Sequence, residues 1–264
     1  MLTFARAGAA AALLALALMP AMAADKAYQN SELNESAIKL EAQIKTDAGT
    51  VTKQAAALRR EADVAFQKND LRTGMTVLGQ AVAIAPEDAA TWLRLARTVL
   101  QIRPRDDKER ALLLDRATTA AFVAYQRAAD RTLEGDSLSV LGRAFADRKQ
   151  WRPALDTLRL SLDIRESADQ RGQYERLRVE HGFRYLNYTV DSDAISPRAC
   201  FQFSENLPGR RTDFSPFVAV AGVDKPAISA NDQQLCVEGL KHGERYTVTL
   251  RAGLPSTVRE TLPK

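Results

Sequence analysis

Up to about Glu180, apolar residues recur at steps of three and four positions, which is the spacing of one face of an α-helix. The first series runs through residues 31–66 and predicts a helix that begins near Ser31. Gly49 interrupts the series, which therefore predicts either one long helix or two. Its apolar members are Leu33, Ala37, Leu40, Ile44, Ala48, Val51, Ala55, Leu58, Ala62 and Ala65.

A longer repeat is superimposed on this helical spacing. Copies begin at Ala55 and Ala89, 34 residues apart, and a third begins near Gly135 after an insertion at residues 103–107. The pattern resembles the tetratricopeptide repeat, in which small residues let two helices approach and larger ones fill the groove to the next hairpin. An unrelated helical bundle with fortuitous spacing is the alternative. The matching positions are Leu58, Ala62, Ala65, Gly74, Leu78, Ala81 and Pro86, then Trp92, Leu95, Ala96 and Val99, then Leu138, Leu141, Gly142, Phe145, Ala154, Leu158 and Ser161.

The repeat also predicts how particular segments pack. We expect Asn69-Asp70 to form the turn inside the first copy, and residues 31–49 to pack on the first helix of that copy as a cap. Five aromatic residues fall on or beside packing positions, so we expect them in the core rather than at a ligand site. Such an array offers a protein-binding surface, although the fold does not name the partner. The five are Trp92, Phe122, Tyr125, Phe145 and Trp151.

Beyond about Glu180, the helical period gives way to short alternating runs separated by Pro, Gly, Asp and Ser. Short strands with turn signals between them predict a β-sandwich. The predicted fold class is therefore α+β, with a helical repeat domain over residues 24–180 and an all-β, immunoglobulin-like sandwich over residues 181–264. The predicted strands are residues 183–190, 198–204, 217–223, 234–237 and 245–251.

Residues 1–23 have the pattern of a secretory signal peptide. Arg6 gives a positive start, an apolar run follows from Ala9 to Leu18, and Ala21-Met22-Ala23 is a small-residue cleavage pattern. A transmembrane anchor needs about 20 apolar residues, so this shorter run does not predict one, and neither does any later stretch. The mature chain is expected to be periplasmic or secreted, without an integral membrane segment.

The charge pattern excludes two classes of partner. Removal of the signal peptide takes away Arg6 and lowers the formal net charge from +4 to +3. Basic and acidic residues are mixed along the chain, with no long basic run. A surface for nucleic acid or an anionic membrane needs clustered basic residues, so we expect neither partner.

Both cysteines lie in predicted strands and are out of step with the apolar alternation. Phe201 follows Cys200, and Leu235 and Val237 flank Cys236, so the two thiols point away from the apolar face. If the strands are neighbours, a disulfide can join Cys200 and Cys236 there. An even cysteine count in an exported chain favours this bridge over free thiols. A redox site lacks a C-x-x-C motif, and a metal site lacks nearby histidines.

Several short motifs of the β half occur together in one known family. They are Tyr188-Thr189-Val190, Cys200 to Phe203, Asp213-Phe214, Leu235 to Leu240 and His242-Gly243. In this combination the chain resembles the first macroglobulin-like domain of bacterial alpha-2-macroglobulins, with the helical repeats as an N-terminal extension. The resemblance implies part of a large exported inhibitor, in which a protease cuts a bait region and is trapped, in many members through a thioester.

The thioester of that family forms within a C-x-E-Q motif. Cys236-Val237-Glu238-Gly239 has the first three positions but carries Gly where Gln is required. We therefore expect no thioester here, and a structural role for Cys236.

No catalytic residue, cofactor site or metal site is predicted. The two histidines, His181 and His242, lie in loop-like contexts, and paired carboxylates such as Asp106-Asp107 lie in polar loops. No glycine-rich phosphate loop is present in the sequence. We expect a protein without enzymatic activity, and a cell-envelope enzyme with an unrecognised site is the third and weakest hypothesis.

Two functions stand ahead of that hypothesis. The first is the N-terminal portion of an alpha-2-macroglobulin-like endopeptidase inhibitor, acting as a scaffold whose partner is a protease or further macroglobulin-like domains. The second is an independent periplasmic adaptor, in which the helical repeats bind another envelope protein. Coding sequence for more macroglobulin-like domains just downstream would favour the first function.

Overall fold

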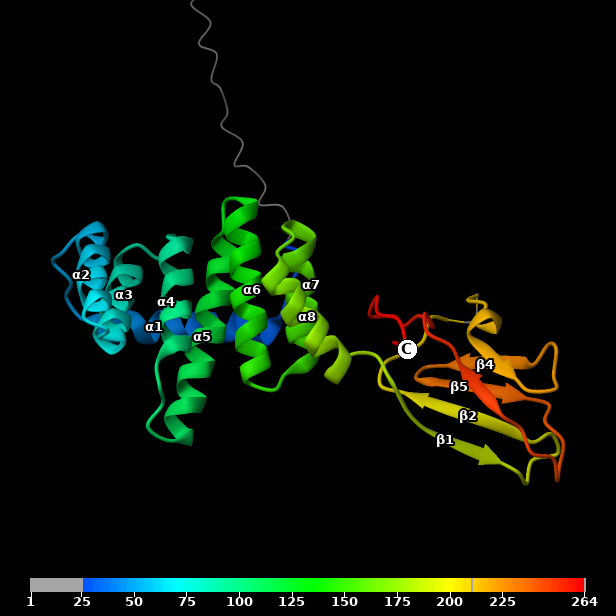
Figure 1. Ribbon diagram of the computed structural model, residues 1–264. Helices are drawn as coiled ribbons and strands as arrows, with labels where there is room; N and C mark the ends of the chain where they lie inside the picture. The colour runs from blue at the N-terminus through cyan, green and yellow to red at the C-terminus, as the bar shows by residue number, and fades with distance from the viewer. Residues whose placement is uncertain (1–25, 210, 264) are drawn as a thin grey trace, which may run out of the picture.

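The computed structural model describes residues 26–209 and 211–263, so the predicted signal peptide at residues 1–23 lies outside the described residues. A row of helices is followed by a small antiparallel β half (Figure 1). The change from helix to strand falls between His181 and Tyr185. We call the two parts the helical half, residues 26–181, and the β half, residues 182–263.

Most of the helical half consists of antiparallel hairpins stacked side by side (Figure 1). α2 packs with α3, α4 with α5, and α6 with α7, while α8 packs against α7 at the end next to the β half. The predicted arrangement of repeated helical hairpins is confirmed. The bounds are α1 (Ser31–Ala48), α2 (Ala55–Gln67), α3 (Leu71–Ile84), α4 (Ala89–Gln101), α5 (Asp107–Arg127), α6 (Arg131–Asp147), α7 (Trp151–Ile164) and α8 (Ala168–His181).

Local sequence signals set where these helices begin. Asp70, Asp88 and Asp130 each precede a helix, and their carboxylates accept a hydrogen bond from the backbone N–H three residues later, at 3.0, 3.1 and 2.8 Å. Asn69, with a φ of 56°, turns the chain from α2 into α3 as predicted, and Lys149, with a φ of 60°, does the same between α6 and α7. Asparagine tolerates this left-handed conformation better than most residues do.

The repeat packing positions meet in one core that runs through the hairpins. Four of the five aromatic residues predicted for the core are fully buried in it, namely Trp92, Phe122, Tyr125 and Phe145. The prediction is wrong for Trp151, which is only partly buried and stacks on His181 with ring centroids 3.8 Å apart. Trp151 begins the last hairpin helix, so no further hairpin covers it and the end of α8 packs there instead.

α1 is a separate helix, and it does not cap the first repeat. Gly49, at a φ of 58°, ends α1, and the chain turns before α2. α1 then crosses α3 and α5, and it does not pack along α2. The face with Leu33, Ala37 and Ile44 is buried in the common core. The apolar period predicted which face of α1 is buried, but it carried no information about which helices cover that face.

Of the predicted insertion, residues 103–106 lie in the connection between α4 and α5, whereas Asp107 already begins α5. Glu109 holds this connection to the first hairpin. The Glu109 carboxylate accepts a hydrogen bond from Arg72 Nη1 at 2.7 Å and another from the backbone N–H of Arg105 at 2.6 Å. These bonds, led by the one from Arg72, lower the pKa of Glu109 to about 2.

Replacing Arg72 with alanine is expected to raise the pKa of Glu109 from about 2 toward its ordinary value of 4.5. A carboxylate with a depressed pKa stabilises the folded protein above pH 4.5, and this contribution is lost as the pH falls toward 2. NMR titration of the side-chain carboxyl measures the shift. Lys53→Ala is the control: it removes an exposed ion pair with Glu61 and should leave the pKa of Glu109 unchanged. An unchanged Glu109 pKa in the Arg72 variant would contradict the assignment.

Two glycines inside helices have opposite surroundings. A methyl group on Gly142 would lie 2.7 Å from Cγ of Leu158 in the facing helix, whereas nothing lies within 4 Å of a methyl group on Gly79. Gly142→Ala is therefore expected to lower the free energy of unfolding by about 1 to 3 kcal/mol. Gly79→Ala, the matched control, should raise it by up to about 1 kcal/mol. Urea denaturation measures both, and a stabilising Gly142→Ala would show that α6 and α7 are not in such close contact.

The β half contains a four-stranded antiparallel sheet in the order β1-β2-β5-β4 and a two-stranded ribbon of β3 and β6. The pattern does not predict β4, whose only large apolar residue is Ile228, and the predicted strands 217–223 and 245–251 shorten to three residues each. A complete macroglobulin-like sandwich stays a prediction. The bounds are β1 (Tyr185–Asp191), β2 (Arg198–Phe203), β3 (Val218–Val220), β4 (Ala227–Asn231), β5 (Gln234–Glu238) and β6 (Val248–Leu250).

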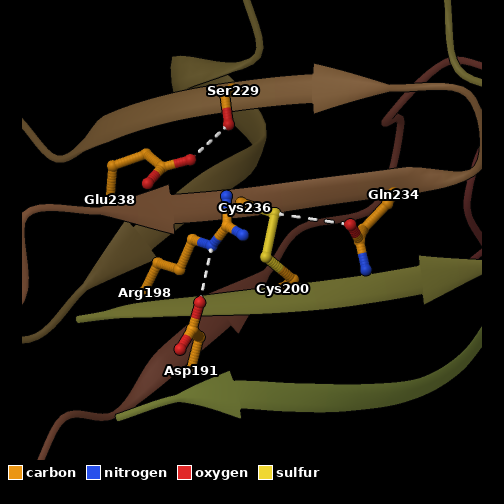
Figure 2. Close-up of a disulfide and its surroundings, with 7 residues drawn as sticks. All are labelled: Asp191, Arg198, Cys200, Ser229, Gln234, Cys236 and Glu238. Carbon is orange, nitrogen blue, oxygen red and sulfur yellow. Dashed lines mark hydrogen bonds and ion pairs between the residues drawn. A yellow bond between two sulfur atoms is a disulfide. The ribbon is translucent and has the colours of Figure 1, made fainter. Parts of the chain in front are cut away.

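A disulfide joins the two central strands of the larger sheet (Figure 2). Cys200 on β2 stands directly opposite Cys236 on β5. Their neighbours Phe201 and Val237 belong to the apolar cluster of the β half, whereas the cysteines do not, so the bridge lies on the other face of the sheet. The disulfide therefore ties together two strands that contribute Ala199, Phe201, Phe203, Leu235 and Val237 to that cluster.

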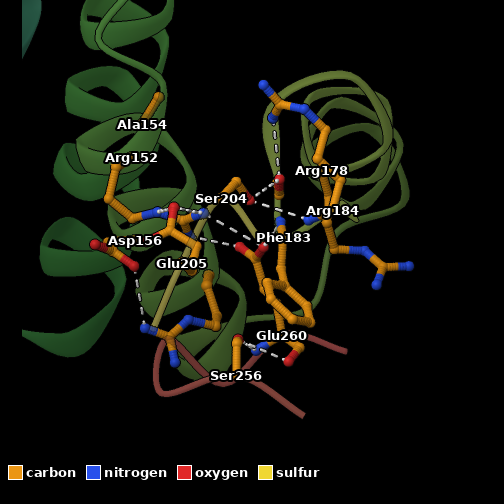
Figure 3. Close-up of polar contacts among 12 residues, drawn as sticks. Arg152, Ala154, Asp156, Arg178, Phe183, Arg184, Ser204, Glu205, Ser256 and Glu260 are labelled. Carbon is orange, nitrogen blue, oxygen red and sulfur yellow. Dashed lines mark hydrogen bonds and ion pairs between the residues drawn. The ribbon is translucent and has the colours of Figure 1, made fainter. Parts of the chain in front are cut away.

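A buried carboxylate joins the helical half to the β half (Figure 3). The side chain of Glu260, 2% exposed, accepts hydrogen bonds from Arg152 Nη1 of α7 and from the backbone N–H of Phe183, both at 2.7 Å. Arg152 also contacts Glu205 at 2.8 Å. Gly182 is needed beside this carboxylate, because a methyl group there would lie 2.8 Å from Glu260 Oε2. We call this set of contacts the joint.

Candidate functional site

An apolar cleft of about 580 Å³ is open on one side of the β half. One wall is formed by β1 and β2, and the other by β6 and the segment that leads into it. The lining side chains are mostly aromatic and aliphatic, which is the composition of binding sites for apolar groups. The principal ones are Tyr185, Tyr188, Val190, Phe201, Leu240, Tyr246, Val248 and Leu250.

The cleft is open because β1 lies outside the core. Register pairs Tyr188 with Phe201 and Val190 with Ala199, so these side chains share one face of the sheet. Phe201 is 8% exposed, whereas Tyr188 and Val190 are 61% and 55% exposed. The two-stranded ribbon packs over the middle of the larger sheet and leaves β1 uncovered. Apolar side chains that a second layer would normally bury are therefore in contact with water.

Among the described residues β2 is the only strand that pairs with β1, so β1 is also an edge strand with a free backbone edge. Natural edge strands are usually protected by lysine, proline or a bulge. Here residues 185–190 contain no charged residue and no proline. A bulge between Tyr185 and Asn187 disturbs only the start of the strand, and the pairing from Asn187 to Asp191 is regular. An exposed edge of this kind is a template for pairing with another extended chain.

A polar turn limits one end of the cleft. The backbone N–H of Lys241 donates to the Tyr246 hydroxyl at 3.2 Å, and the backbone N–H of Leu240 donates to the Pro197 carbonyl at 3.0 Å. These bonds hold the turn against the end of β1 that carries Asp191. Lys241, His242 and Glu244 form the polar rim.

The helical half presents a different surface, built from ion pairs between successive hairpins. Asp63 of α2 pairs with Arg94 of α4, and Arg97 of α4 pairs with Asp136 of α6 at 3.0 Å. All four groups are partly exposed, so each pair contributes about 1 kcal/mol or less. Because arginine and aspartate neutralise each other along this face, its charge does not specify a partner.

The histidines and paired carboxylates noted in the sequence do not come together. His181 stacks on an indole at the joint, whereas His242 lies at the rim of the cleft. Asp106 caps α5, and Asp191 lies 3.5 Å from Arg198. In the described part of the chain, no group of three or more His, Cys, Asp or Glu side chains could hold a metal ion. None of the helices described here has the length and apolar character needed to cross a membrane.

The sequence pattern predicts the residues of the cleft only in part. Tyr185, Tyr188 and Val190 all fall in the predicted strand 183–190, but the bulge shifts the alternation by one residue between Tyr185 and Tyr188. A strand with an apolar face is normally assigned to the core. Only the strand order shows that this face is left without a covering layer.

No protein-family model matches the chain, and no curated protein matches it. Among solved structures, the N-terminal domain of stress-induced protein-1 (STI-1) from C. elegans is similar over 47% of this chain and 94% of its own, at 18% identity and a TM-score of 0.39. The first TPR of Spaghetti (RPAP3), bound to an HSP90 peptide, is similar over 50% of this chain and 95% of its own, at 11% identity and a TM-score of 0.41. Similarities this low do not bear on what this chain binds.

Proposed function

We propose that this chain is a non-enzymatic, exported protein-interaction scaffold, and that it is the N-terminal portion of an alpha-2-macroglobulin-like endopeptidase inhibitor. The observation that carries the scaffold proposal is the open cleft beside the free edge of β1. Contiguous exposed apolar surface of this kind marks interaction sites in soluble proteins. The stacked hairpins add a second extended surface, since arrays of this architecture commonly bind proteins.

The inhibitor proposal rests on the β half. Its motifs resemble those of a macroglobulin-like domain, and its central strands carry the disulfide between Cys200 and Cys236. A disulfide in a small β unit suits an oxidising compartment such as the periplasm. With Gly239 in place of the glutamine that a thioester needs, this region supports and positions the inhibitor rather than capturing the protease covalently.

An independent periplasmic adaptor is the second candidate, and a groove on the helical half favours it. This groove, of about 700 Å³, lies between α1, α5 and the turn before α7. Arg116 lines it, and the Arg116 Nε is buried without a hydrogen-bond partner among the described residues. Burial also lowers the pKa of Arg116. The Arg116 side chain as a whole is 27% exposed and lies 4.0 Å from Asp47, so its guanidinium can still donate to an acidic group of a partner.

Affinity capture from cell-envelope extract, followed by mass spectrometry, separates these functions. The bait is the disulfide-bonded chain, and a Val190→Lys variant tests whether the partner uses the cleft. Capture of a protease or of a macroglobulin-like polypeptide supports the inhibitor function. Capture of an unrelated envelope protein that is lost in an Arg116→Ala variant supports the adaptor. Equal recovery of the same proteins on uncoated resin overturns the scaffold proposal.

A further inference from the structure

The free edge of β1 is complementary to a second copy of itself. Arg184 and Asp191 are the only charged residues in the stretch 184–191, and they stand at its two ends. A second copy that pairs with β1 in the antiparallel sense places the start of each strand beside the end of the other. Opposite charges then meet at both ends of the paired strands, whereas a parallel pairing would bring like charges together.

The two charges also lie on the same face of the sheet. Tyr185 and Val190 pair with residues of the apolar cluster, so both lie on the apolar face. Side chains alternate along a strand, so their neighbours Arg184 and Asp191 point to the other face. Figure 2 shows Asp191 near the disulfide, 3.5 Å from Arg198. A second copy in the plane of the sheet can therefore bring the two charges together on this face.

Both charged side chains can take a further partner. The Arg184 guanidinium donates to the Gly182 carbonyl at 3.2 Å and has five N–H donors in all. The Asp191 side chain is 45% exposed, and its two carboxylate oxygens can accept from a second arginine besides Arg198. An ion pair across the edge of the sheet is thus compatible with the contacts that each residue already makes.

One register satisfies both the charges and the side-chain faces. The bulge between Tyr185 and Asn187 adds one residue to that part of β1. When Tyr188 stands opposite Tyr188 of the second copy, Asn187 faces Thr189, and the added residue brings Tyr185 opposite Val190. The charged residues that flank this last pair then face each other. Apolar side chains meet on the cleft face, and polar side chains meet on the other face.

We propose that two copies of this chain form a two-fold symmetric dimer through antiparallel pairing of β1, centred on Tyr188, which joins their four-stranded sheets into one. Each β1 leads away from its own helical half, so the two helical halves lie at opposite ends of the joined sheet (Figure 1). The added strand lies in the plane of the sheet and leaves the cleft open to another protein. The inference goes beyond the proposed scaffold function, because it concerns how copies of the chain assemble.

Sedimentation velocity of the disulfide-bonded chain tests the dimer. The parent chain should change from monomer to dimer between micromolar and submillimolar concentration. Arg184→Glu and Asp191→Lys should each weaken the dimer about tenfold, because the two-fold axis makes like charges meet twice. An equimolar mixture of the two variants should dimerise about as well as the parent chain, since both pairs across the edge are again of opposite charge.

A cysteine at the two-fold axis tests the register. Tyr188 stands opposite its counterpart with Cα atoms about 5 Å apart, which is within reach of a disulfide. Tyr188→Cys should therefore give a covalent dimer under mild oxidation, measured on non-reducing gels. Asn187→Cys is the matched control. Asn187 faces Thr189 of the second copy, so this variant should cross-link about tenfold less.

Three results would overturn the proposal. One is a parent chain that stays monomeric at submillimolar concentration. Another is an equimolar mixture of Arg184→Glu and Asp191→Lys that dimerises no better than either variant alone. The last is equal cross-linking of Tyr188→Cys and Asn187→Cys, which would mean that β1 does not pair about Tyr188. Each of these could occur while capture from envelope extract still succeeds, so the scaffold function would stand without the dimer.

Discussion

Replacing Glu260 with alanine is expected to lower the free energy of unfolding by about 3 kcal/mol. The Glu260 carboxylate is almost completely buried and accepts hydrogen bonds from Arg152 Nη1 and from the backbone N–H of Phe183. Its removal leaves the buried N–H without a partner and takes one of two carboxylates away from Arg152. Loss of one member of a buried pair typically costs about 3 to 5 kcal/mol. We expect the lower end of this range because Arg152 still forms its ion pair with Glu205.

Glu205→Ala is the matched control, since Glu205 contacts the same arginine from a more exposed position. Its side chain is 24% exposed, so its loss should cost about 1 kcal/mol or less. Glu260→Gln should fall between the two alanine variants, because an amide oxygen can still accept one hydrogen bond. Urea denaturation of the three variants gives the comparison. Equal losses from Glu260→Ala and Glu205→Ala would mean that burial at the joint contributes little.

The same experiment tests whether the joint makes the two halves unfold together. Contacts between them run from Arg152 of α7 to Glu205, just after β2, and to Glu260, near the end of the β half. If these contacts carry the coupling, the parent protein should unfold in one transition. Glu260→Ala should then separate the transition of the β half from that of the helical half, with the β half unfolding at lower urea. Tryptophan fluorescence, which reports Trp92 and Trp151 of the helical half, and hydrogen exchange at the backbone amides of β2 and β5 follow the two halves separately.

The helical half was largely predictable because most of its helices bury one periodic face, although α5 is buried on all sides from Ala117 to Tyr125 and α8 buries only Tyr174. The burial of Leu58 and Leu138, for example, follows from their positions in the repeat. The placement of α1 was not predictable, since periodicity does not say which neighbour covers a face. The joint also could not be predicted from the sequence. The hydrogen bonds that Glu260 accepts come from residues 77 and 108 positions away in the chain and follow no repeated pattern. Single polar residues that meet across such distances leave no local signal.

The β half shows a different limit. Alternation around Cys200 and Cys236 predicts which way their side chains point, since a strand has a fixed period of two. Strand order is not local, so the sequence pattern places Tyr188 and Val190 on an apolar face without showing that this face is uncovered. The cleft therefore follows from topology: β1 is at the edge, and the second layer is only a two-stranded ribbon.

Reduction of the Cys200–Cys236 disulfide is expected to lower the free energy of unfolding of the β half by roughly 4 kcal/mol. The two cysteines are 36 residues apart, so the bridge closes a loop that holds β3, β4 and the turns between them. An unfolded chain with this loop closed has fewer conformations, and the folded state is favoured correspondingly. A small sheet with an open cleft has little other apolar burial to replace that contribution.

Reduction is a cleaner change than substitution, because Cys200 and Cys236 are 5% and 6% exposed and their replacement by alanine would also remove buried side-chain volume. Urea denaturation with and without a phosphine reductant measures the difference, and alkylation with mass spectrometry counts the thiols in each sample. The oxidised protein should show no alkylatable thiol. Two alkylatable thiols in protein isolated from the periplasm would contradict the bridge.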